Sequence, residues 1–196
     1  GLKNVAHDRG GAITDARHPS ANTHAIRMGQ AINSTNANTY CLDFDGTADY
    51  LLHNSPNWQN SDTRGTIFAW IYFDAVNAEQ YIFSTAQASS DSHYLRFGIK
   101  NDGKLRFHVY GGTAACDYNG TTALTASQWN SVAVVSSGTA IAFYLNGSVD
   151  SAASGTGEAW LDSHASQRTR LGIGAYLGST IQAYVNGKII QVAYWG

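Results

Sequence analysis

Paired carboxylates are the first residues of this sequence that could carry chemistry. Asp43 and Asp45 lie two residues apart in LDFDG, so both project from the same face of an expected strand. Glycoside hydrolysis uses two carboxyl groups about 5–10 Å apart across the sugar. The run ends at Gly46, however, and an aspartate before a glycine turn commonly caps that turn through its own side chain. We therefore expect Asp43 and Asp45 to cap a turn rather than to catalyse a reaction.

Other catalytic patterns are weak. The two glutamates, Glu79 and Glu158, have no strand-borne carboxylate two residues away. The seven histidines show no HxxxH or HxH spacing, and no GxSxG motif accompanies a Ser-His-Asp triad. Neither a lysine nor an expected helix follows the GIG at 172–174, as a phosphate-binding loop requires. We expect no catalytic residues and no enzyme.

Aromatic residues in expected loops suit ligand binding better. A pyranose presents an apolar C–H face and a polar rim, so it binds aromatic rings that stand beside amide and hydroxyl groups. Trp58 in NSPNWQN, Tyr118 in CDYNG and Trp160 in GEAWLD each have such polar neighbours. These three residues are the predicted ligand-binding residues.

Metal binding has little support in the spacing of the acidic residues. A calcium ion takes six to eight oxygen ligands. Six aspartates lie in expected loops, but nothing in the sequence groups them: Asp49, Asp62, Asp91, Asp102, Asp117 and Asp162. Solvated turn residues are the default interpretation, so no metal ligand is assigned. One structural calcium is the single cofactor left open.

The composition excludes several classes of partner. The 196 residues suffice for one domain, and 43% of them are hydrophobic. Only 13% are charged, about half the usual share of a soluble domain. The net charge is −2 and no basic run occurs, so we expect no nucleic-acid partner. The longest apolar runs are far shorter than the roughly 18 residues of a membrane helix, so we expect no membrane partner.

The first 38 residues differ from the rest of the chain. They show neither a helical nor a strand period, and they are broken by Gly10-Gly11, Pro19 and an Asn/Ser/Thr cluster. We interpret residues 1–38 as an extended N-terminal arm that becomes ordered against a partner subunit, with a floppy tail as the alternative. Residues 39–196 form the predicted domain, in which we favour two separate buried thiols at Cys41 and Cys116 over a disulfide.

From Tyr40 onward the pattern is that of short strands separated by turns. The segment 67–73 is apolar on both faces, which is typical of a central strand, and its stripe of Phe68, Trp70 and Tyr72 could line a concave face. We favour ordinary core for that stripe. Hairpin turns are predicted at 101–103 and at Asn146-Gly147. Many short strands with frequent turn signals predict an all-β sandwich or barrel.

The order of several motifs resembles a known family. The segments CLDFDGTADYLLH, TIFAWIYFD, QWNSVAVVSSGTAIAFYLNGSVD, LGIGAY and GKIIQVAYW are similar, in order and spacing, to strands of the laminin-G-like family. The resemblance covers about residues 40–196. It implies a two-layer antiparallel β-sandwich, a concanavalin-A-like jelly roll, often with one calcium ion at its rim. Ile190 and Gln191 stand where many relatives carry an Asp-Glu pair, so the role of that pair is not carried over.

These observations favour a binding or coating function. The first hypothesis is a structural and adhesive module on a virion surface, such as a phage head-decoration or fibre protein. Its arm would bind neighbouring protein subunits, as in a homo-oligomer, and its loops would bind surface glycans. The weakly charged composition, the arm and an N-terminus without the apolar core of a secretion signal support it. The alternative is a secreted carbohydrate-binding or cell-adhesion domain of a larger extracellular protein, and the third hypothesis is a polysaccharide-cleaving enzyme.

Overall fold

The computed structural model describes residues 15–17, 28–30, 40–54, 59, 61–111, 114–151, 154–157 and 159–196. No α-helix occurs in these residues, and their one helical element is a 3-10 helix, η1 (Leu161–Gln167). No helix of the described chain has the length and apolar character needed to cross a membrane. The strands are β1 (Asp15–Arg17), β2 (Met28–Gln30), β3 (Tyr40–Asp45), β4 (Tyr50–His53), β5 (Gly65–Phe73), β6 (Gln80–Ala86), β7 (His93–Ile99), β8 (Lys104–Gly111), β9 (Ala114–Ala123), β10 (Trp129–Ser136), β11 (Ile141–Leu145), β12 (Ser148–Asp150), β13 (Ser154–Thr156), β14 (Arg170–Ile173), β15 (Tyr176–Leu177), β16 (Ile181–Gln182) and β17 (Asn186–Trp195).

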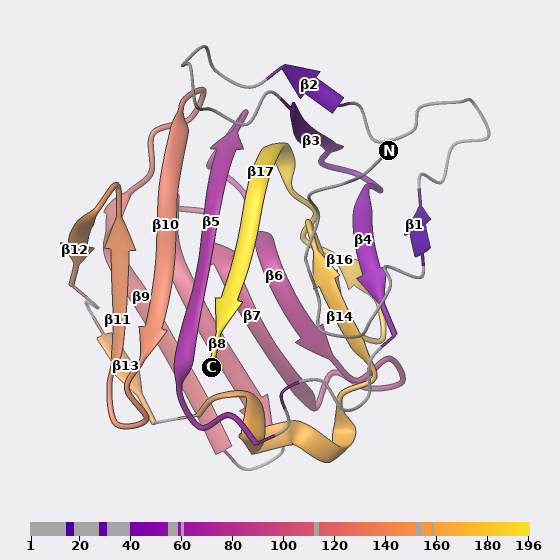
Figure 1. Cartoon of the computed structure of the whole chain (residues 1–196), viewed down its shortest axis with the longest axis vertical. Coiled ribbons are helices and arrows are strands. Elements are labelled where there is room, and N and C mark those ends of the chain that lie inside the picture. Colours follow the sequence, from indigo (N-terminus) through magenta and orange to yellow (C-terminus); the bar gives the residue numbers. More distant parts are fainter. Residues whose placement is uncertain are drawn as a thin grey trace.

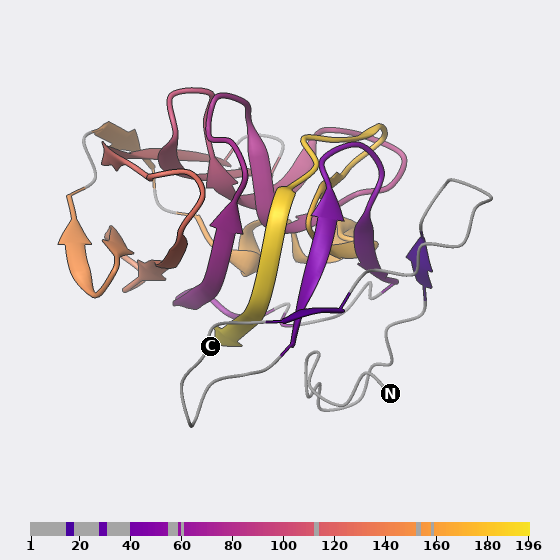
Figure 2. The ribbon, with the colours of Figure 1, turned by 90° about the horizontal axis from the view of Figure 1, so that it is seen from above.

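Two antiparallel sheets face each other and form a sandwich (Figures 1 and 2). One sheet has the strand order β1-β4-β14-β6-β7-β8-β9-β13, and the other has the order β12-β11-β10-β5-β17-β3-β2. We refer to them as the eight-stranded and the seven-stranded sheet. A small third sheet consists of β15 and β16. The predicted all-β, two-layer antiparallel fold is confirmed.

The main core lies between the two sheets because alternate residues of their strands are apolar. On β5, Ile67, Ala69, Ile71 and Phe73 point inward and are fully buried. The inner residues of β7 and β8 meet them from the opposite sheet, and the ring of Phe97 stacks on that of Phe143 with centroids 6.4 Å apart. Such alternation fixes the register, since a slip by one residue would expose the whole apolar set.

Both predicted hairpin turns are present. Gly103 has a φ of +75°, a conformation that glycine adopts at little cost. Asn146 and Gly147 have φ values of +52° and +81°, the two positive angles that a two-residue hairpin loop between β11 and β12 requires. The two cysteines, Cys41 and Cys116, are buried thiols with no disulfide between them, as expected.

Two short parts of the N-terminal arm belong to the sandwich itself. Strand β1 pairs with β4 at one edge of the eight-stranded sheet, and β2 pairs with β3 at one edge of the seven-stranded sheet. Pairing of this kind covers edge strands that would otherwise present unpaired backbone groups. The rest of residues 1–38 lies outside the described residues, and binding of a partner subunit by the arm stays a prediction.

Candidate functional site

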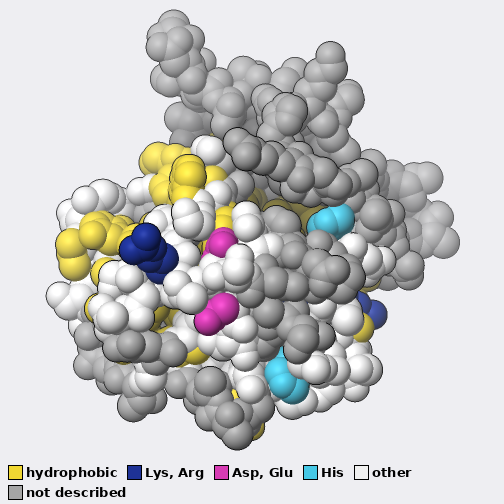
Figure 3. Space-filling model, turned by 60° about the horizontal axis from the view of Figure 1, so that its bottom comes forward, with side chains coloured by type: hydrophobic (Ala, Val, Ile, Leu, Met, Phe, Trp, Pro, Cys, Tyr) yellow, Lys and Arg dark blue, Asp and Glu magenta, His cyan; other side chains and the backbone are white. Residues whose placement is uncertain are grey.

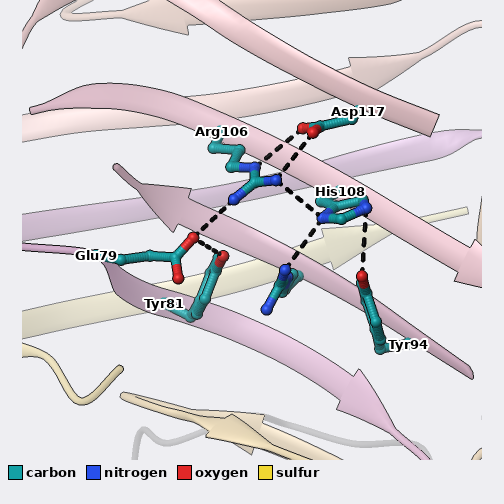
Figure 4. A network of polar contacts seen from close by, with 7 residues as sticks. Glu79, Tyr81, Tyr94, Arg106, His108 and Asp117 are labelled. Atoms are coloured by element: carbon teal, nitrogen blue, oxygen red, sulfur yellow. Dashed lines mark hydrogen bonds and ion pairs between the residues drawn. The ribbon is translucent and has the colours of Figure 1, made fainter. Parts of the chain in front are cut away.

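The outer face of the eight-stranded sheet carries a cluster of charged and aromatic side chains. On β7 and β8 the inner residues are buried, and the residues between them, among them Arg96, Arg106 and His108, point outward. The strand register places Arg96 opposite His108 and His108 opposite Asp117, so three neighbouring strands contribute to one face. We call this set the arginine–tyrosine cluster, and its members are Glu79, Tyr81, Tyr94, Arg96, Arg106, His108, Asp117 and Tyr176. Figure 4 shows the polar contacts that link Glu79, Tyr81, Tyr94, Arg106, His108 and Asp117.

A close approach of two strands brings β6 into the cluster. The register between β6 and β7 shifts between Tyr81 and Phe83, as at a β-bulge. Gly98 pairs with Tyr81, and a Cβ atom at Gly98 would lie 2.0 Å from the carbonyl oxygen of Gln80. A glycine is therefore needed for β6 to lie this close. The result is that Tyr81 and the preceding Glu79 reach Arg106.

Arg106 holds the two carboxylates of the cluster in place. Its Nε and Nη2 atoms donate to Asp117 Oδ1 and Oδ2 at 2.9 and 2.8 Å, a bidentate pair. Its Nη1 atom donates to Glu79 Oε1 at 2.7 Å, and the Tyr81 hydroxyl donates to the same oxygen. The hydrogen bonds that Arg106 donates to Asp117 raise the pKa of the Arg106 guanidinium. Burial works to raise the pKa of the Asp117 carboxyl, but hydrogen bonds and charge from Arg106 outweigh it and lower that pKa.

His108 lies between the two arginines as a neutral ring that carries its proton on Nε2. Its Nδ1 atom is 3.1 Å from Arg96 Nη2 and 3.2 Å from Arg106 Nη2. Guanidinium nitrogens can only donate hydrogen bonds, so Nδ1 must be the unprotonated acceptor. The proton of the neutral ring is therefore on Nε2, which donates to the Tyr94 hydroxyl at 3.3 Å. Burial, followed by the charge of Arg96, lowers the pKa of His108 to about 4.

The low pKa of His108 predicts a loss of stability in mild acid. In the unfolded chain a histidine binds a proton below about pH 6.5, whereas folded His108 binds one only near pH 4. Between these values the unfolded state holds more protons, so the free energy of unfolding falls as the pH decreases from 6.5 to 4. We expect a contribution of about 1–2 kcal/mol, because solvent reaches part of the ring and reduces the full effect.

Urea unfolding at pH 7.5 and pH 4.5 measures this contribution. The comparison is with His108→Gln, whose amide oxygen can accept from the arginines but does not titrate. The groups that face the imidazole, namely Arg96, Arg106, Asp117, Glu79 and Tyr94, are the same in both proteins. A pH-dependent decrease of equal size in the two proteins would exclude a depressed pKa at His108.

Arg96 is the cation of the cluster that has no carboxylate at ion-pair distance among the described residues. Its guanidinium carbon lies 4.9 Å from the ring centroid of Tyr81, 4.5 Å from that of Tyr94 and 5.2 Å from that of Tyr176. Its Nε atom is buried without a hydrogen-bond partner in the described structure. Three electron-rich rings thus hold a positive charge at the surface of the sheet.

The β15–β16 hairpin supplies the third of these tyrosines. It lies against the outer face of β6, and the ring of Tyr176 packs on those of Tyr81 and Tyr94 at 6.3 and 5.6 Å. The Tyr176 hydroxyl donates to Asp91 Oδ1 at 2.8 Å, and Asp91 also accepts from the backbone N–H of Ser179 at 3.0 Å. Hydrogen bonds from Ser179 lower the pKa of the Asp91 carboxyl. Asp91 therefore holds both the first strand and the turn of the hairpin.

The chemistry of the cluster suits binding rather than turnover. Acid–base cleavage of a glycosidic bond needs one carboxylic acid that keeps its proton near neutral pH. Here Arg106 binds both Glu79 and Asp117, and it lowers the pKa of Asp117. The cluster is instead a set of fixed hydrogen-bonding groups beside aromatic rings.

The structure places the three sequence-predicted binding residues differently. Trp58 lies outside the described residues. Tyr118 is on β9 rather than in a loop, where its ring packs at the margin of the core and its hydroxyl donates to the Gly157 carbonyl at 3.2 Å. Trp160 precedes η1 and is 1% exposed, with its ring 5.0 Å from that of Phe107. The prediction that Trp160 offers a face to a ligand is wrong, because the residue fills the core.

Asp43 and Asp45 make separate local contacts. Asp45 Oδ1 accepts from the backbone N–H groups of Thr47 and Ala48 at 2.8 Å each, which confirms that it caps the turn at Gly46. Burial opposes these bonds, yet they lower the pKa of Asp45. Asp43 lies 3.8 Å from Lys188 Nζ. Among the described residues no group of three or more His, Cys, Asp or Glu side chains could hold a metal ion, and the calcium site stays a prediction.

The aromatic stripe of β5 is not core. Phe68, Trp70 and Tyr72 point away from the opposite sheet, and Trp70 is 39% exposed. The apolar character of both strand faces favoured burial on both sides, but no described segment covers Trp70.

Sequence reasoning did not single out the arginine–tyrosine cluster. A signal was present, since Tyr94, Arg96, Arg106 and His108 occupy the outward positions of one predicted hairpin. The contributions of Glu79 and Tyr176 had no local signal because they come from other elements.

The two facing antiparallel sheets define a β-sandwich domain of the jelly-roll class. A family profile described as the concanavalin A-like lectin/glucanases superfamily matches residues 45–196. The chain belongs to that superfamily. Comparison with curated protein sequences gives no match.

Solved structures of related fold include a CBM40 domain, a sialidase and a pair of laminin domains. The CBM40 domain of Ruminococcus gnavus IT-sialidase, bound to α2,3-sialyllactose, has a TM-score of 0.64 and 14% identity, covering 79% of this chain and 88% of that one. The NanB sialidase of Streptococcus pneumoniae has a TM-score of 0.62 and 12% identity, with 79% of this chain aligned to 25% of that one. Mouse laminin α1 domains LG4-5 have a TM-score of 0.56 and 16% identity, covering 78% and 40%. The chain thus spans about a quarter of the sialidase structure, and these likenesses establish the fold.

Proposed function

We propose that this domain is a non-enzymatic, lectin-like module that binds an acidic glycan through the arginine–tyrosine cluster. The observation that carries the proposal is Arg96, a cation fixed among three tyrosine rings with no carboxylate of the described chain at ion-pair distance. A sugar carboxylate would supply the missing negative charge, and a charge-assisted hydrogen bond to a guanidinium is among the stronger polar contacts.

The neighbouring groups support the same ligand class. Tyrosine hydroxyls, the His108 imidazole and the partly exposed carboxylates of Glu79 and Asp117 can all bond sugar hydroxyls. Their mutual hydrogen bonds hold them in place before a ligand arrives, which reduces the entropy lost on binding. The CBM40 domain of related fold has sialyllactose bound, which makes a sialylated oligosaccharide the natural first probe.

Isothermal titration with two matched sugars tests this function. The whole chain is titrated with α2,3-sialyllactose and with lactose, which lacks the carboxylate-bearing sugar. We expect saturable binding of sialyllactose and at least about tenfold weaker binding of lactose, since a charge-assisted contact contributes about 1.5–3 kcal/mol. Equal affinity for both sugars, or no binding of either, would overturn the proposal.

The setting in which such a module works is a separate part of the proposal. A virion surface, with the arm bound to neighbouring subunits, fits a weakly charged sandwich with an N-terminal extension. A carbohydrate-binding domain of a larger secreted protein fits the same fold. Co-purification of the full chain with assembled particles distinguishes these settings.

A further inference from the structure

The outer face of the seven-stranded sheet carries several exposed hydrophobic side chains. Three large hydrophobic residues are exposed among the described residues. Their exposed fractions are 39% for Trp70, 63% for Val149 and 55% for Trp195. All three point outward from this one sheet, as their pairing with Ser131, Tyr144 and Thr66 shows. The solvent face of an antiparallel sheet is ordinarily polar, so this concentration calls for a physical explanation.

The exposed residues form one continuous surface. The ring of Phe68 lies 6.5 Å from those of Trp70 and Trp195, and the rings of Tyr72 and Trp129 are 5.7 Å apart. A row of paired residues runs across five strands from Ala193 through Phe68, Ala133 and Tyr144 to Val149. We call this surface the aromatic face, and its members are Phe68, Trp70, Tyr72, Trp129, Tyr144, Val149 and Trp195.

Among the described residues, the groups between the rings of the aromatic face are uncharged, and a lysine lies at its edge. Between the rings, the outward residues include Thr66, Ser131 and Gln191, which offer hydroxyl and amide groups without charge. The nearest cation is Lys188, whose Nζ lies 5.0 Å from the Tyr72 ring centroid and within 4 Å of a carboxylate oxygen of Asp43 and one of Asp74. In the view from the end of the sandwich where β17 finishes, hydrophobic side chains form patches on one side, with a basic side chain between them and acidic side chains nearby (Figure 3).

We propose that the aromatic face binds an uncharged polysaccharide chain. Exposed rings of tryptophan and tyrosine can stack on the apolar C–H faces of successive sugars, and the interspersed hydroxyl and amide groups can bond their rims. Phe68, Trp70 and Tyr72 repeat every second residue along β5, so their rings are spaced about 6.6 Å apart along the strand. A row of rings of this kind suits an extended polymer better than a single sugar.

The size of the face argues against a second copy of the chain as the occupant. Five strands at about 4.8 Å spacing span about 19 Å, and the six steps from Thr66 to Tyr72 span about 20 Å. The resulting footprint of about 380 Å² is well below the about 800 Å² per partner of a stable protein interface. The absence of charge at the centre of the face also disfavours an acidic or basic ligand.

Affinity gel electrophoresis with neutral polymers tests the proposal. The whole chain is run in native gels that contain laminarin, hydroxyethylcellulose or galactomannan. We expect at least one polymer to retard migration, and Trp70→Ala to weaken its apparent affinity at least about tenfold. Trp70→Tyr keeps an aromatic ring and should retain most of the retardation. Because the contacts are uncharged, addition of salt should leave the retardation unchanged.

Controls separate this surface from the arginine–tyrosine cluster. Arg96→Met lies on the other sheet and should leave retardation by neutral polymers unchanged, whereas Trp70→Ala should leave sialyllactose binding unchanged. The two proposals can therefore fail independently. Absence of retardation by all three polymers, or unchanged retardation of Trp70→Ala, would overturn the proposal. A concentration-dependent dimer in sedimentation that Trp70→Ala abolishes would assign the face to a second copy instead.

Discussion

Replacing Trp160 with alanine is expected to lower the free energy of unfolding by about 3–5 kcal/mol, the usual cost of deleting a large buried aromatic side chain. Trp160 is 1% exposed, and its ring lies against those of Phe107 and Tyr194 at 5.0 and 6.4 Å. The substitution removes these contacts and leaves a cavity. The two hydrogen-bonded sheets can relax into this cavity only in part, because the core is closely packed. Urea unfolding followed by far-UV circular dichroism measures the loss.

The same substitution also removes the first donor of a chain of hydrogen bonds. The Trp160 indole N–H donates to the Tyr194 hydroxyl at 3.1 Å, and that hydroxyl donates to Asp62 Oδ2 at 2.6 Å. Arg168 lies in the same region, 2% exposed, and burial lowers its pKa to about 10. Trp160→Phe keeps most of the ring but loses the donor, so we expect it to cost about 1–2 kcal/mol.

Trp195→Ala is the matched control, because Trp195 is 55% exposed and its removal should cost less than about 1 kcal/mol. If Trp160→Ala instead kept its stability and lost ligand affinity, Trp160 would be a binding residue after all.

The sandwich was predictable from the sequence because its determinants are local. The alternation of Leu95, Phe97 and Ile99 with polar residues sets the faces of β7, and Asn146-Gly147 sets a hairpin turn. Each of these signals acts within a few residues, so a single sequence carries them. The turn cap at Asp45 was predictable for the same reason, because the aspartate stands directly before Gly46.

The site was less predictable because its determinants are distant in sequence. Ser179 and Asp91 fix the hairpin that delivers Tyr176, and these residues are 88 positions apart. Trp160 was misassigned for a related reason: its polar neighbours are typical of a loop, yet the ring turns into the core behind η1. Composition around a residue does not specify the direction of its side chain.

The two outer faces of the sandwich differ in their electrostatics. The arginine–tyrosine cluster on the eight-stranded sheet contains two arginines, and Arg106 is neutralised by Glu79 and Asp117 while Arg96 has no carboxylate at ion-pair distance among the described residues. The aromatic face of the seven-stranded sheet carries rings and uncharged groups, with Lys188 beside Tyr72 at its edge. One domain would therefore offer an acidic glycan and a neutral one separate surfaces, and substitutions on either sheet should leave the other surface intact.

Arg96→Met is expected to weaken binding of α2,3-sialyllactose by about 10–150-fold, because a hydrogen bond to a charged group contributes about 1.5–3 kcal/mol. Methionine is flexible and fills the space among the three tyrosine rings, so the fold should persist. Arg96→Lys keeps the charge but lacks the planar fork, and we expect intermediate affinity. Isothermal titration gives the affinities, and thermal unfolding confirms that each variant is folded.

Lys188→Met is the matched control for the loss of charge, since Lys188 is also a cation over a tyrosine ring but lies on the seven-stranded sheet. It removes one positive charge from the protein without touching the cluster, so any general effect of net charge on an anionic sugar appears in both variants. A decrease confined to Arg96→Met places the sugar carboxylate at the cluster. Equal decreases in the two variants, or none in either, would mean that Arg96 does not contact the ligand.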